Sequence, residues 1–379
     1  FSSIHSVLQV GDTHGQFHDV LALFASAGKP SEKNLFLFNG DFVDRGAWGV
    51  EVLSTLLSWK VSWYFVTNQS AHRLRSSNFL FYHPFPLSLV CGHFSKNKYI
   101  ISLAHLSLSL SLPLSVCLPP SQLCYPESVF LTRGNHESSS CTMAYGFYKE
   151  LSLKYPDSNW ERIYQLCKGV FAALPLCAII EDKVYVAHGG IFRDPQPSKG
   201  KGAKKHKSKK RKQNKELKVG SLRQLRAASK GGVDPDNAVA SQLISTDVLW
   251  SDPQSCKGLS DNENRGIGLL FGPDMTEQFL SENNLKLIIR SHEGPDSRIY
   301  REDMKSLNGG YSIDHEVASG TLVTVFSAPD YPQFADPEER TFNLAAYVVL
   351  RHPDISTPEF KQFPAKPRPQ MPDLFDEDS

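Results

Sequence analysis

The feature that most constrains the fold of this chain is the stretch GDFVDRG at residues 40–46. An apolar run, 35–38, leads into Asn39-Gly40, which predicts a short buried strand that ends in a tight turn. Open α/β sheets bind their ligands at the carboxyl ends of strands, so two carboxylates and a guanidinium are expected at such an edge. One Asp could bridge two metal ions, the other could orient a histidine, and Arg45 could bind a phosphate. A hairpin with a surface Asp–Arg pair could have the same sequence, so the motif alone leaves both interpretations open.

Four other apolar runs also end in residues of the types that bind metal ions. Strands are predicted at 6–10, 127–131, 184–187 and 285–289, and they lead to the motifs GDTHGQ, TRGNHE, HGG and RSHE. These motifs contain Asp12, His14, Asn135, His136, His188 and His292. Each one alone has a structural explanation, such as a helix-capping turn or a hydrogen-bonded internal histidine. No single structural explanation accounts for five successive predicted strands that all end in residues of this kind. Their carboxylate and amide oxygens and imidazole nitrogens suit a pair of manganese, iron or zinc ions.

Segments with helical spacing lie between several of these strands. Apolar residues recur every three or four positions, which predicts amphipathic helices at 17–24, 48–59, 147–155 and 159–171. Further strands are predicted at 176–180 and 321–326, and the strand at 344–350 is expected to be the last. The length of 379 residues suits one large α/β catalytic domain or two smaller ones.

The bulk composition argues against several classes of protein. The net charge is +1 and 21% of the residues are charged, so composition indicates neither nucleic acid nor another charged partner. Seven cysteines without a C-x-x-C pair argue against a disulfide framework and a structural zinc site, and favour reduced thiols in the cytosol or nucleus. No secretory signal of the usual form is visible. Because the first residue is Phe1 and not Met, we expect a fragment or a doubtful gene model.

One long stretch differs in composition from the rest of the chain. Residues 52–126 contain no Asp or Glu, although the chain has 40 acidic residues. Within this stretch, 99–118 is long enough for a membrane helix, but five Ser, His105 and Pro113 argue against one, and no membrane association is expected. An exposed, aggregation-prone strand is a further interpretation. We favour the hypothesis that residues 62–124 are translated non-coding sequence, such as a retained intron, that interrupts a single domain.

A second insertion is expected at 195–240, where basic residues are concentrated. Between Lys199 and Lys218, eleven residues are Lys or Arg and one is acidic. Such a run repels itself, which predicts a mobile solvated loop. It could also be a nuclear localisation signal, a site for an acidic partner or, with the apolar residues that follow, a basic amphipathic helix that binds calmodulin at residues 204–230. The Pro-rich and then acidic tail, 365–379, is expected to be disordered.

Taken together, the motifs GDTHGQ, GDFVDRG, RGNHE, HGG, RSHE and SAPDY resemble those of the phosphoprotein (PPP) family of serine/threonine phosphatases. The resemblance covers residues 7 to about 195 and 243 to 350, apart from the acid-free stretch. It implies a metallophosphatase sandwich of two mixed β-sheets flanked by helices, in a single catalytic domain. It also implies hydrolysis of phosphoserine and phosphothreonine in proteins by direct attack of a metal-bridging hydroxide. The details RGAWG, GLLFGPD and RSHEGPD look like the plant type-seven branch, which implies calmodulin binding and location in the nucleus and cytoplasm.

The resemblance further implies a role for each residue of the expected site. Six residues would bind two divalent ions: Asp12, His14, Asp41, Asn135, His188 and His292. The first three would hold one ion, and Asp41 would bridge to the second ion, held by the last three. His136, oriented by Asp44, would protonate the leaving oxygen of the substrate. The residues that would hold the phosphate are Arg45 and Arg265, with Tyr331 over the site.

Two other functions remain open from the sequence. The first is a catalytically impaired splice or gene-model variant that acts as a binding scaffold, because the acid-free stretch interrupts the domain. The second is a metallophosphoesterase that acts on nucleotides, since such enzymes share the Asp-x-His and Asn-His motifs. The joint presence of Arg265, His292 and the SAPDY segment argues against the second function.

Overall fold

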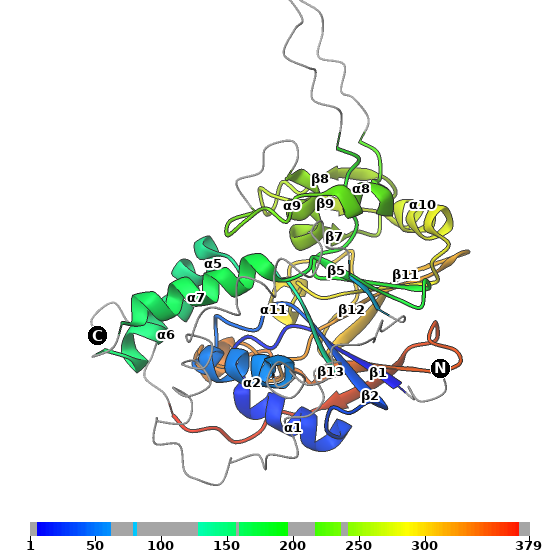
Figure 1. The fold of residues 1–379 in the computed structure, drawn as a ribbon. Helices are drawn as coiled ribbons and strands as arrows, with labels where there is room; N and C mark the ends of the chain where they lie inside the picture. The colour runs from blue at the N-terminus through cyan, green and yellow to red at the C-terminus, as the bar shows by residue number, and fades with distance from the viewer. Residues whose placement is uncertain are drawn as a thin grey trace, which may run out of the picture.

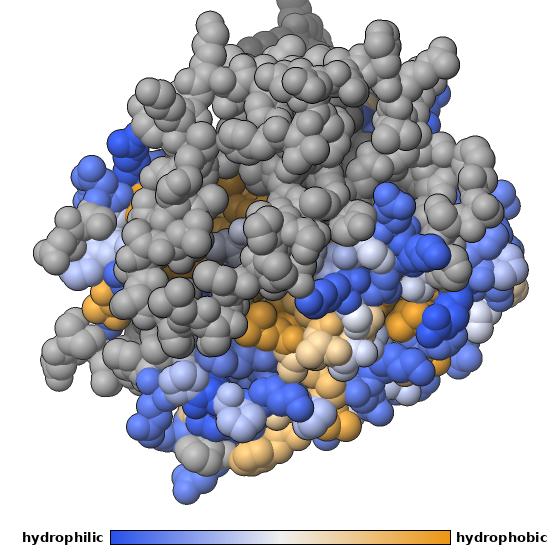
Figure 2. Space-filling view, turned by 60° about the horizontal axis from the view of Figure 1, so that its bottom comes forward, coloured by the Kyte–Doolittle hydropathy of each residue, from blue (hydrophilic) through white to orange (hydrophobic). Residues whose placement is uncertain are grey.

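The computed structural model of this chain describes residues 6–61, 79–81, 128–156, 159–195, 217–235 and 242–370. Two large β-sheets pack face to face, and helices cover their outer faces (Figure 1). The face at the bottom of that view is seen in Figure 2, where hydrophilic side chains cover much of the described surface and smaller groups of hydrophobic ones lie among them. In the described residues, no helix is both long and apolar enough to cross a membrane.

The first sheet is mixed and has the strand order β14-β13-β1-β2-β4. Its strands are β1 (Ser6–Val10), β2 (Asn34–Asn39), β4 (Val129–Thr132), β13 (Ala345–Arg351) and β14 (Glu359–Phe363). β2 runs parallel to both β1 and β4, with Val10 opposite Phe38 and Phe38 opposite Leu131. β13 and β14 are antiparallel additions on the other side of β1. The parallel strands β1, β2 and β4 therefore all end at the same edge.

The second sheet is also mixed, with the order β11-β12-β10-β6-β5-β3. Its strands are β3 (Phe79–Phe81), β5 (Cys177–Ile180), β6 (Val184–Ala187), β10 (Leu287–Arg290), β11 (Tyr311–Val317) and β12 (Gly320–Val325). β10 is parallel to both β6 and β12. A small third sheet consists of β7 (Asp252–Pro253), β8 (Leu259–Asp261) and β9 (Leu269–Phe271).

The helices divide between the two outer faces. The first group is α1 (Phe17–Ala27), α2 (Gly49–Val61), α5 (Ser139–Ala144), α6 (Phe147–Lys154) and α7 (Trp160–Ala173). The second group is α8 (Leu222–Ala227), α9 (Leu243–Trp250) and α10 (Pro273–Asn283). Two short helices, α11 (Pro295–Arg298) and η3 (Pro337–Glu339), lie in connections.

Three clusters of buried apolar side chains hold these layers together. The central cluster lies between the sheets and joins Leu35 and Leu37 of β2 to Val186 of β6 and Ile289 of β10. A second cluster packs α1, α2, α6 and α7 on the first sheet, and a third packs α8, α9 and α10 on the second. Strands buried on both faces read as continuous apolar runs, which is why these strands were recognisable in the sequence. The predicted fold class, two mixed sheets flanked by helices, is confirmed.

The prediction that residues 344–350 form the last strand is wrong. β13 occupies this position, but β14 follows it and pairs with it, with Val348 opposite Phe360. β14 is an edge strand of five residues, EFKQF, and only Phe363 is buried in it. A short edge strand with a single buried residue lacks the apolar run on which the prediction depended.

Residues 365–370, expected to belong to a disordered tail, lie against the body of the protein. The N–H of Lys366 donates to the buried carboxylate of Asp19 at 2.7 Å, and Arg368 forms an ion pair with Asp330 at 3.2 Å. A buried carboxylate needs donors, and the backbone at residue 366 supplies one of them. The expectation of disorder is therefore wrong for 365–370, while 371–379 lie outside the described residues.

The two expected insertions are described only in part. Of residues 62–124, the structure describes 79–81, which form β3 beside β5 at an edge of the second sheet. The remainder of that stretch, with the candidate membrane segment, lies outside the described residues, as do 196–216 and 236–240 of the basic insertion. The described part of the basic insertion, 217–235, contains α8 and contributes Val219, Leu225 and Ala228 to the apolar cluster on the second sheet.

Candidate active site

The expected site lies at the carboxyl ends of five strands, where the two sheets meet. Asp12 and His14 follow β1, Asp41 follows β2, Asn135 follows β4, His188 follows β6, and His292 follows β10. The backbones of the two sheets touch here through a β-bridge between Asp12 and Phe326. The site opens into a cleft of about 190 Å³. Nine of the expected residues line it: Asp12, His14, Asp41, Arg45, Asn135, His136, Arg265, His292 and Tyr331.

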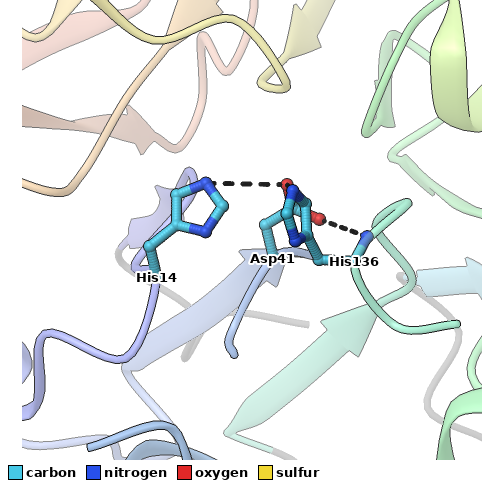
Figure 3. A group of neighbouring side chains, drawn as sticks. All are labelled: His14, Asp41 and His136. Carbon is cyan, nitrogen blue, oxygen red and sulfur yellow. Dashed lines mark hydrogen bonds and ion pairs between the residues drawn. The ribbon is translucent and has the colours of Figure 1, made fainter. Parts of the chain in front are cut away.

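Asp41 is the centre of this arrangement. Its Oδ2 lies 3.8 Å from His14 Nε2 and 3.3 Å from His188 Nε2, and its Oδ1 accepts the N–H of His136 at 3.0 Å. Figure 3 shows the Asp41 carboxylate between His14 and His136. Asp41 belongs to two groups of side chains that could each hold a metal ion, one with His14 and His136 and the other with His188 and His292. One carboxylate between two ligand groups suits two ions that share it.

The environment of His188 fits a bound cation. Its Nδ1 lies 2.8 Å from the carbonyl oxygen of Asn39 and donates there, which leaves a lone pair on Nε2. That Nε2 faces two oxygen acceptors, Oδ1 of Asn135 at 2.8 Å and Oδ2 of Asp41 at 3.3 Å. Three acceptor atoms this close repel one another unless a proton or a cation lies between them. A metal ion of the manganese, iron or zinc type would satisfy all three ligands.

Burial makes the charges of this site costly without a counter-charge. Asp12 and Asp41 are each 1% exposed. Burial raises the pKa of the Asp12 carboxyl to about 8, partly opposed by His188. Burial lowers the pKa of His188, but the carboxylates of Asp41 and Asp12 outweigh it and raise that pKa to about 9. Positive charge in the midst of these groups is therefore strongly favoured, and divalent ions would supply it.

The turns that carry these residues depart from ordinary backbone conformations. The φ angles of His14, Asp41, Asp44, Arg45 and His292 are 41°, 52°, 69°, 70° and 71°. Side chains other than Gly adopt this left-handed region only when the surrounding structure enforces it, and such residues cluster at functional sites. Gly134 makes one of these turns feasible, because a Cβ there would lie 2.1 Å from Oδ1 of Asp41.

His136 is held by a carboxylate behind it. Its Nδ1 lies 2.7 Å from Oδ2 of Asp44, and the other oxygen of Asp44 accepts the N–H of Phe147. With Nδ1–H donating to Asp44, Nε2 is the ring atom free to exchange a proton with a substrate. Burial lowers the pKa of His136 to about 4, while the nearby Asp41 charge opposes this shift. A bound phosphate dianion would raise that pKa and favour the protonated ring.

The two arginines of the site are held in different ways. The Arg45 guanidinium carbon lies 4.2 Å from the centre of the Tyr145 ring and 5.9 Å from that of Phe334. Its buried Nε has no hydrogen-bond partner among the described residues. Nε of Arg265, in contrast, donates to Oδ2 of Asp252 at 2.5 Å. Arg45 therefore keeps its donors for a ligand, whereas Arg265 is fixed from behind by a carboxylate.

A comparison with known proteins assigns the family. A family model described as calcineurin-like phosphoesterase matches residues 5–67 and 108–296. Serine/threonine-protein phosphatase 7 of Arabidopsis thaliana is 42% identical over 378 residues, which cover 99% of this chain and 76% of that protein. The chain belongs to the serine/threonine-protein phosphatases with a calcineurin-like phosphoesterase domain.

Other phosphatases agree with this assignment. The chain is 32% identical over 361 residues to human serine/threonine-protein phosphatase 5, covering 95% of this chain and 49% of that protein. It is 38% identical over 385 residues to an Arabidopsis serine/threonine-protein phosphatase 7 long form homolog, of which it covers 24%. A solved structure of a Saccharomyces cerevisiae protein serine/threonine phosphatase with similarity to human PP5 matches with a TM-score of 0.61 and 26% identity, covering 98% of this chain and 84% of that one. The resemblance and the metallophosphatase fold inferred from the motifs are thereby confirmed, and the scaffold alternative gains no support.

All the expected site residues come together in this phosphatase. Asp44 and His188 do not line the cleft but lie behind it, in contact with His136 and Asp41 respectively. The ring of Tyr331 stacks on His14, with 5.4 Å between ring centres. Burial raises the pKa of Tyr331 well above its usual value, which keeps its hydroxyl protonated.

Several residues that organise the site were not singled out from the sequence. Glu137 accepts the N–H groups of Asp41, Phe42 and Gly134, each at 2.8 Å, and so joins the turns after β2 and β4. Asp252 accepts from Arg265 and also from Arg290, at 2.9 Å. Glu137 lies within the motif RGNHE, but only the partners of these two acids in space reveal what they do.

Arg133 is a further missed residue, and it joins the turn that carries Asn135 and His136 to the basic insertion. Its side chain is fully buried and donates to backbone carbonyl oxygens of Glu137, Gly232 and Val233, at 2.6–3.0 Å. Nearby, Asp234 accepts the N–H groups of Ser139 and Ser140 at the start of α5. We refer to residues 228–235, which belong to the described part of the basic insertion, as the return segment.

Proposed function

We propose that this phosphatase hydrolyses phosphoserine and phosphothreonine in proteins and requires two divalent metal ions, manganese, iron or zinc. The observation that carries the proposal is the Asp41 carboxylate, which belongs to two separate groups of potential metal ligands. The names of the relatives, all serine/threonine-protein phosphatases, support the substrate class.

Six residues would hold the two ions: Asp12, His14, Asp41, Asn135, His188 and His292. Asp12 and His14 would share one ion with Asp41, and the other three would share the second ion with it. When bound, two such ions supply a nucleophile from water near neutral pH and neutralise charge on the phosphate. His136 is assigned to proton transfer rather than to the metals, because the Asp44 carboxylate at its Nδ1 can stabilise the charged ring that proton donation needs.

The protein's own side chains would bind the phosphate and supply the proton. Arg45 and Arg265 line the same cleft and would each donate to phosphate oxygens in the forked geometry that guanidinium groups favour. His136 Nε2 would give its proton to the serine or threonine oxygen as the ester bond breaks, while Asp44 stabilises the charged ring. Tyr331, protonated and packed on His14, would close one wall of the cleft.

The proposal is tested by hydrolysis of phosphoserine and phosphothreonine peptides with and without metal. We expect phosphate release that needs added manganese, that stops with a chelator, and that returns when manganese is restored. The change Asp41→Asn should abolish release and lower the number of bound metal ions, because it weakens both ligand groups at once. Full activity after exhaustive chelation, or in the Asp41→Asn variant, would contradict the proposal.

We further propose, from the basic insertion, that the protein binds calmodulin at residues 204–230 and is located in the nucleus and cytoplasm. The concentration of Lys and Arg between Lys199 and Lys218 supports both parts. Val219, Leu225 and Ala228 are buried in the domain, so calmodulin would have to bind the basic run itself or release these side chains. Calorimetry of calcium-loaded calmodulin with the whole protein and with a 204–230 peptide tests the partner, and a lack of binding to both rejects it. Deletion of 199–218 should reduce nuclear fluorescence of a tagged protein.

A further inference from the structure

The cleft contains one acidic residue that has no place in the metal or phosphate machinery described above. Asp296 follows Gly294-Pro295 at the start of α11, four residues after His292. It lines the same cleft as Arg45, Arg265 and Tyr331. Gly294 leaves room for its carboxylate, since a Cβ at residue 294 would lie 2.4 Å from Oδ1 of Asp296.

The Asp296 carboxylate differs from the other acids near the site in having no charged partner. Asp44 binds His136, Asp252 binds Arg265 and Arg290, and Glu293 binds Arg290 and Arg298. Within the described part of the chain Asp296 forms no ion pair, and its carboxylate accepts from the backbone N–H of Ser297 but from no side chain. Burial raises its pKa, and the charges of Arg45 and Arg265 oppose that shift. The carboxylate thus lies in the field of both arginines without being bound by either.

An unpaired carboxylate in a phosphate-binding cleft acts differently on different substrates. It repels the phosphate dianion that Arg45 and Arg265 attract, which lowers affinity for a substrate that brings only negative charge. A substrate with a cationic side chain close to the phosphorylated residue would pair with the carboxylate and remove that penalty. Discrimination of this kind, with a repulsive element against the wrong partner, is a common source of specificity.

We propose that Asp296 is a specificity-determining residue that favours phosphoserine and phosphothreonine sites with an Arg or Lys next to the phosphorylated residue. This inference rests on the proposed function. Arg is the better of the two partners, because its planar fork can donate two hydrogen bonds to one carboxylate.

The experiment compares phosphopeptides that differ at one position only. Arg, Gln or Glu is placed directly before or directly after the phosphoserine, and kcat/KM is measured for each peptide with manganese present. We expect the wild-type protein to prefer Arg over Gln on at least one side by about fivefold, the size of a partly exposed ion pair, and to disfavour Glu. Asp296→Asn should bring the Arg/Gln ratio close to one, Asp296→Lys should reverse the preference towards Glu, and Asp296→Glu should keep it.

A matched variant separates this effect from a general change of charge. Glu316→Gln removes one negative charge from an exposed position on β11, outside the cleft, and should leave the Arg/Gln ratio unchanged. Equal kcat/KM for all peptides in the wild-type protein, or equal loss on every peptide in Asp296→Asn, would overturn the inference and leave the proposed function standing. A wild-type protein that hydrolyses neither these peptides nor an aryl phosphate would instead overturn the proposed function and this inference with it.

Discussion

At the scale of the residue, the two arginines of the cleft differ in how much freedom they retain. Arg45 is held by the faces of Tyr145 and Phe334, and these contacts occupy none of its N–H donors. Arg265 is bound through its Nε by Asp252, which is itself bound by Arg290. We infer that Arg265 is positioned before the substrate arrives, while Arg45 can adjust to the phosphate.

The role of His136 can be tested through the leaving group of the substrate. We expect His136→Asn to lower kcat on a phosphoserine peptide by about 10²–10⁴-fold, because an alkoxide leaving group needs a proton. The loss on p-nitrophenyl phosphate should be much smaller, since nitrophenolate leaves without one. Steady-state kinetics on both substrates checks this expectation.

Metal content provides the control for that variant. The six proposed ligands remain in His136→Asn, so the number of metal ions bound per chain should stay at the wild-type value. An equal loss on both substrates, or loss of metal, would show that His136 is a ligand of the ions and not the proton donor.

At the scale of the element, the turn after β4 is held from two sides. Glu137 binds the turn after β2, and Arg133 binds the return segment of the basic insertion. Asp234 of the return segment caps the first N–H groups of α5. The turn that carries Asn135 and His136 therefore depends on contacts with residues about 100 positions away.

The change Arg133→Met tests that dependence. It retains apolar volume but removes the donor to the buried carbonyl oxygen of Glu137 and to the part-buried carbonyl oxygens of Gly232 and Val233. We expect the free energy of unfolding to fall by about 1–3 kcal/mol, the cost of one unsatisfied buried acceptor. Denaturant unfolding measures this change, and kcat should fall as well because His136 loses its support.

Arg351→Met is the matched control for Arg133→Met. Arg351 is exposed and pairs with Glu359, so its replacement should change the free energy of unfolding by less than about 0.5 kcal/mol. If both variants lost the same small amount, Arg133 would have no special part in holding the turn.

At the scale of the whole molecule, the domain has all its site residues outside the stretch 62–124. The site is assembled from the ends of β1, β2, β4, β6 and β10. The part of the stretch that the structure describes, β3, is an edge strand that pairs only with β5. Its removal would expose one edge of the second sheet and leave the remaining order of strands intact.

We therefore predict that a protein lacking 62–124, with Val61 joined to Tyr125, hydrolyses phosphopeptides at least as well as the full chain. Shortening the connection between α2 and β4 also reduces the entropy cost of closing it, although that cost grows only logarithmically with length. Manganese-dependent kcat/KM and thermal unfolding of the two proteins measure the outcome. An inactive shortened protein beside an active full chain would show that the stretch is part of the domain. If the main mature transcript were found to include the whole stretch, its origin as a retained intron would be contradicted.

The sequence, through the resemblance that its motifs carry, predicted the layered α/β architecture, and the residues it indicated as metal ligands and phosphate contacts lie together in the structure. Each predicted ligand follows its own buried strand within a few positions, as Asp41 follows β2 and His292 follows β10. Strand and turn signals are local, and a ligand directly after a strand is carried to the sheet edge with it.

Only the tertiary structure decided which residues support that site and what else shares its cleft. Glu137 and Arg133 act on partners about 95–100 residues away, and Asp296 is distinguished from other acids only by the charged partner it lacks. The packing of residues 365–370 and the edge strand β14 likewise depend on surfaces formed by distant parts of the chain. Local propensity carries no information on such contacts, because they exist only once the two sheets have packed together.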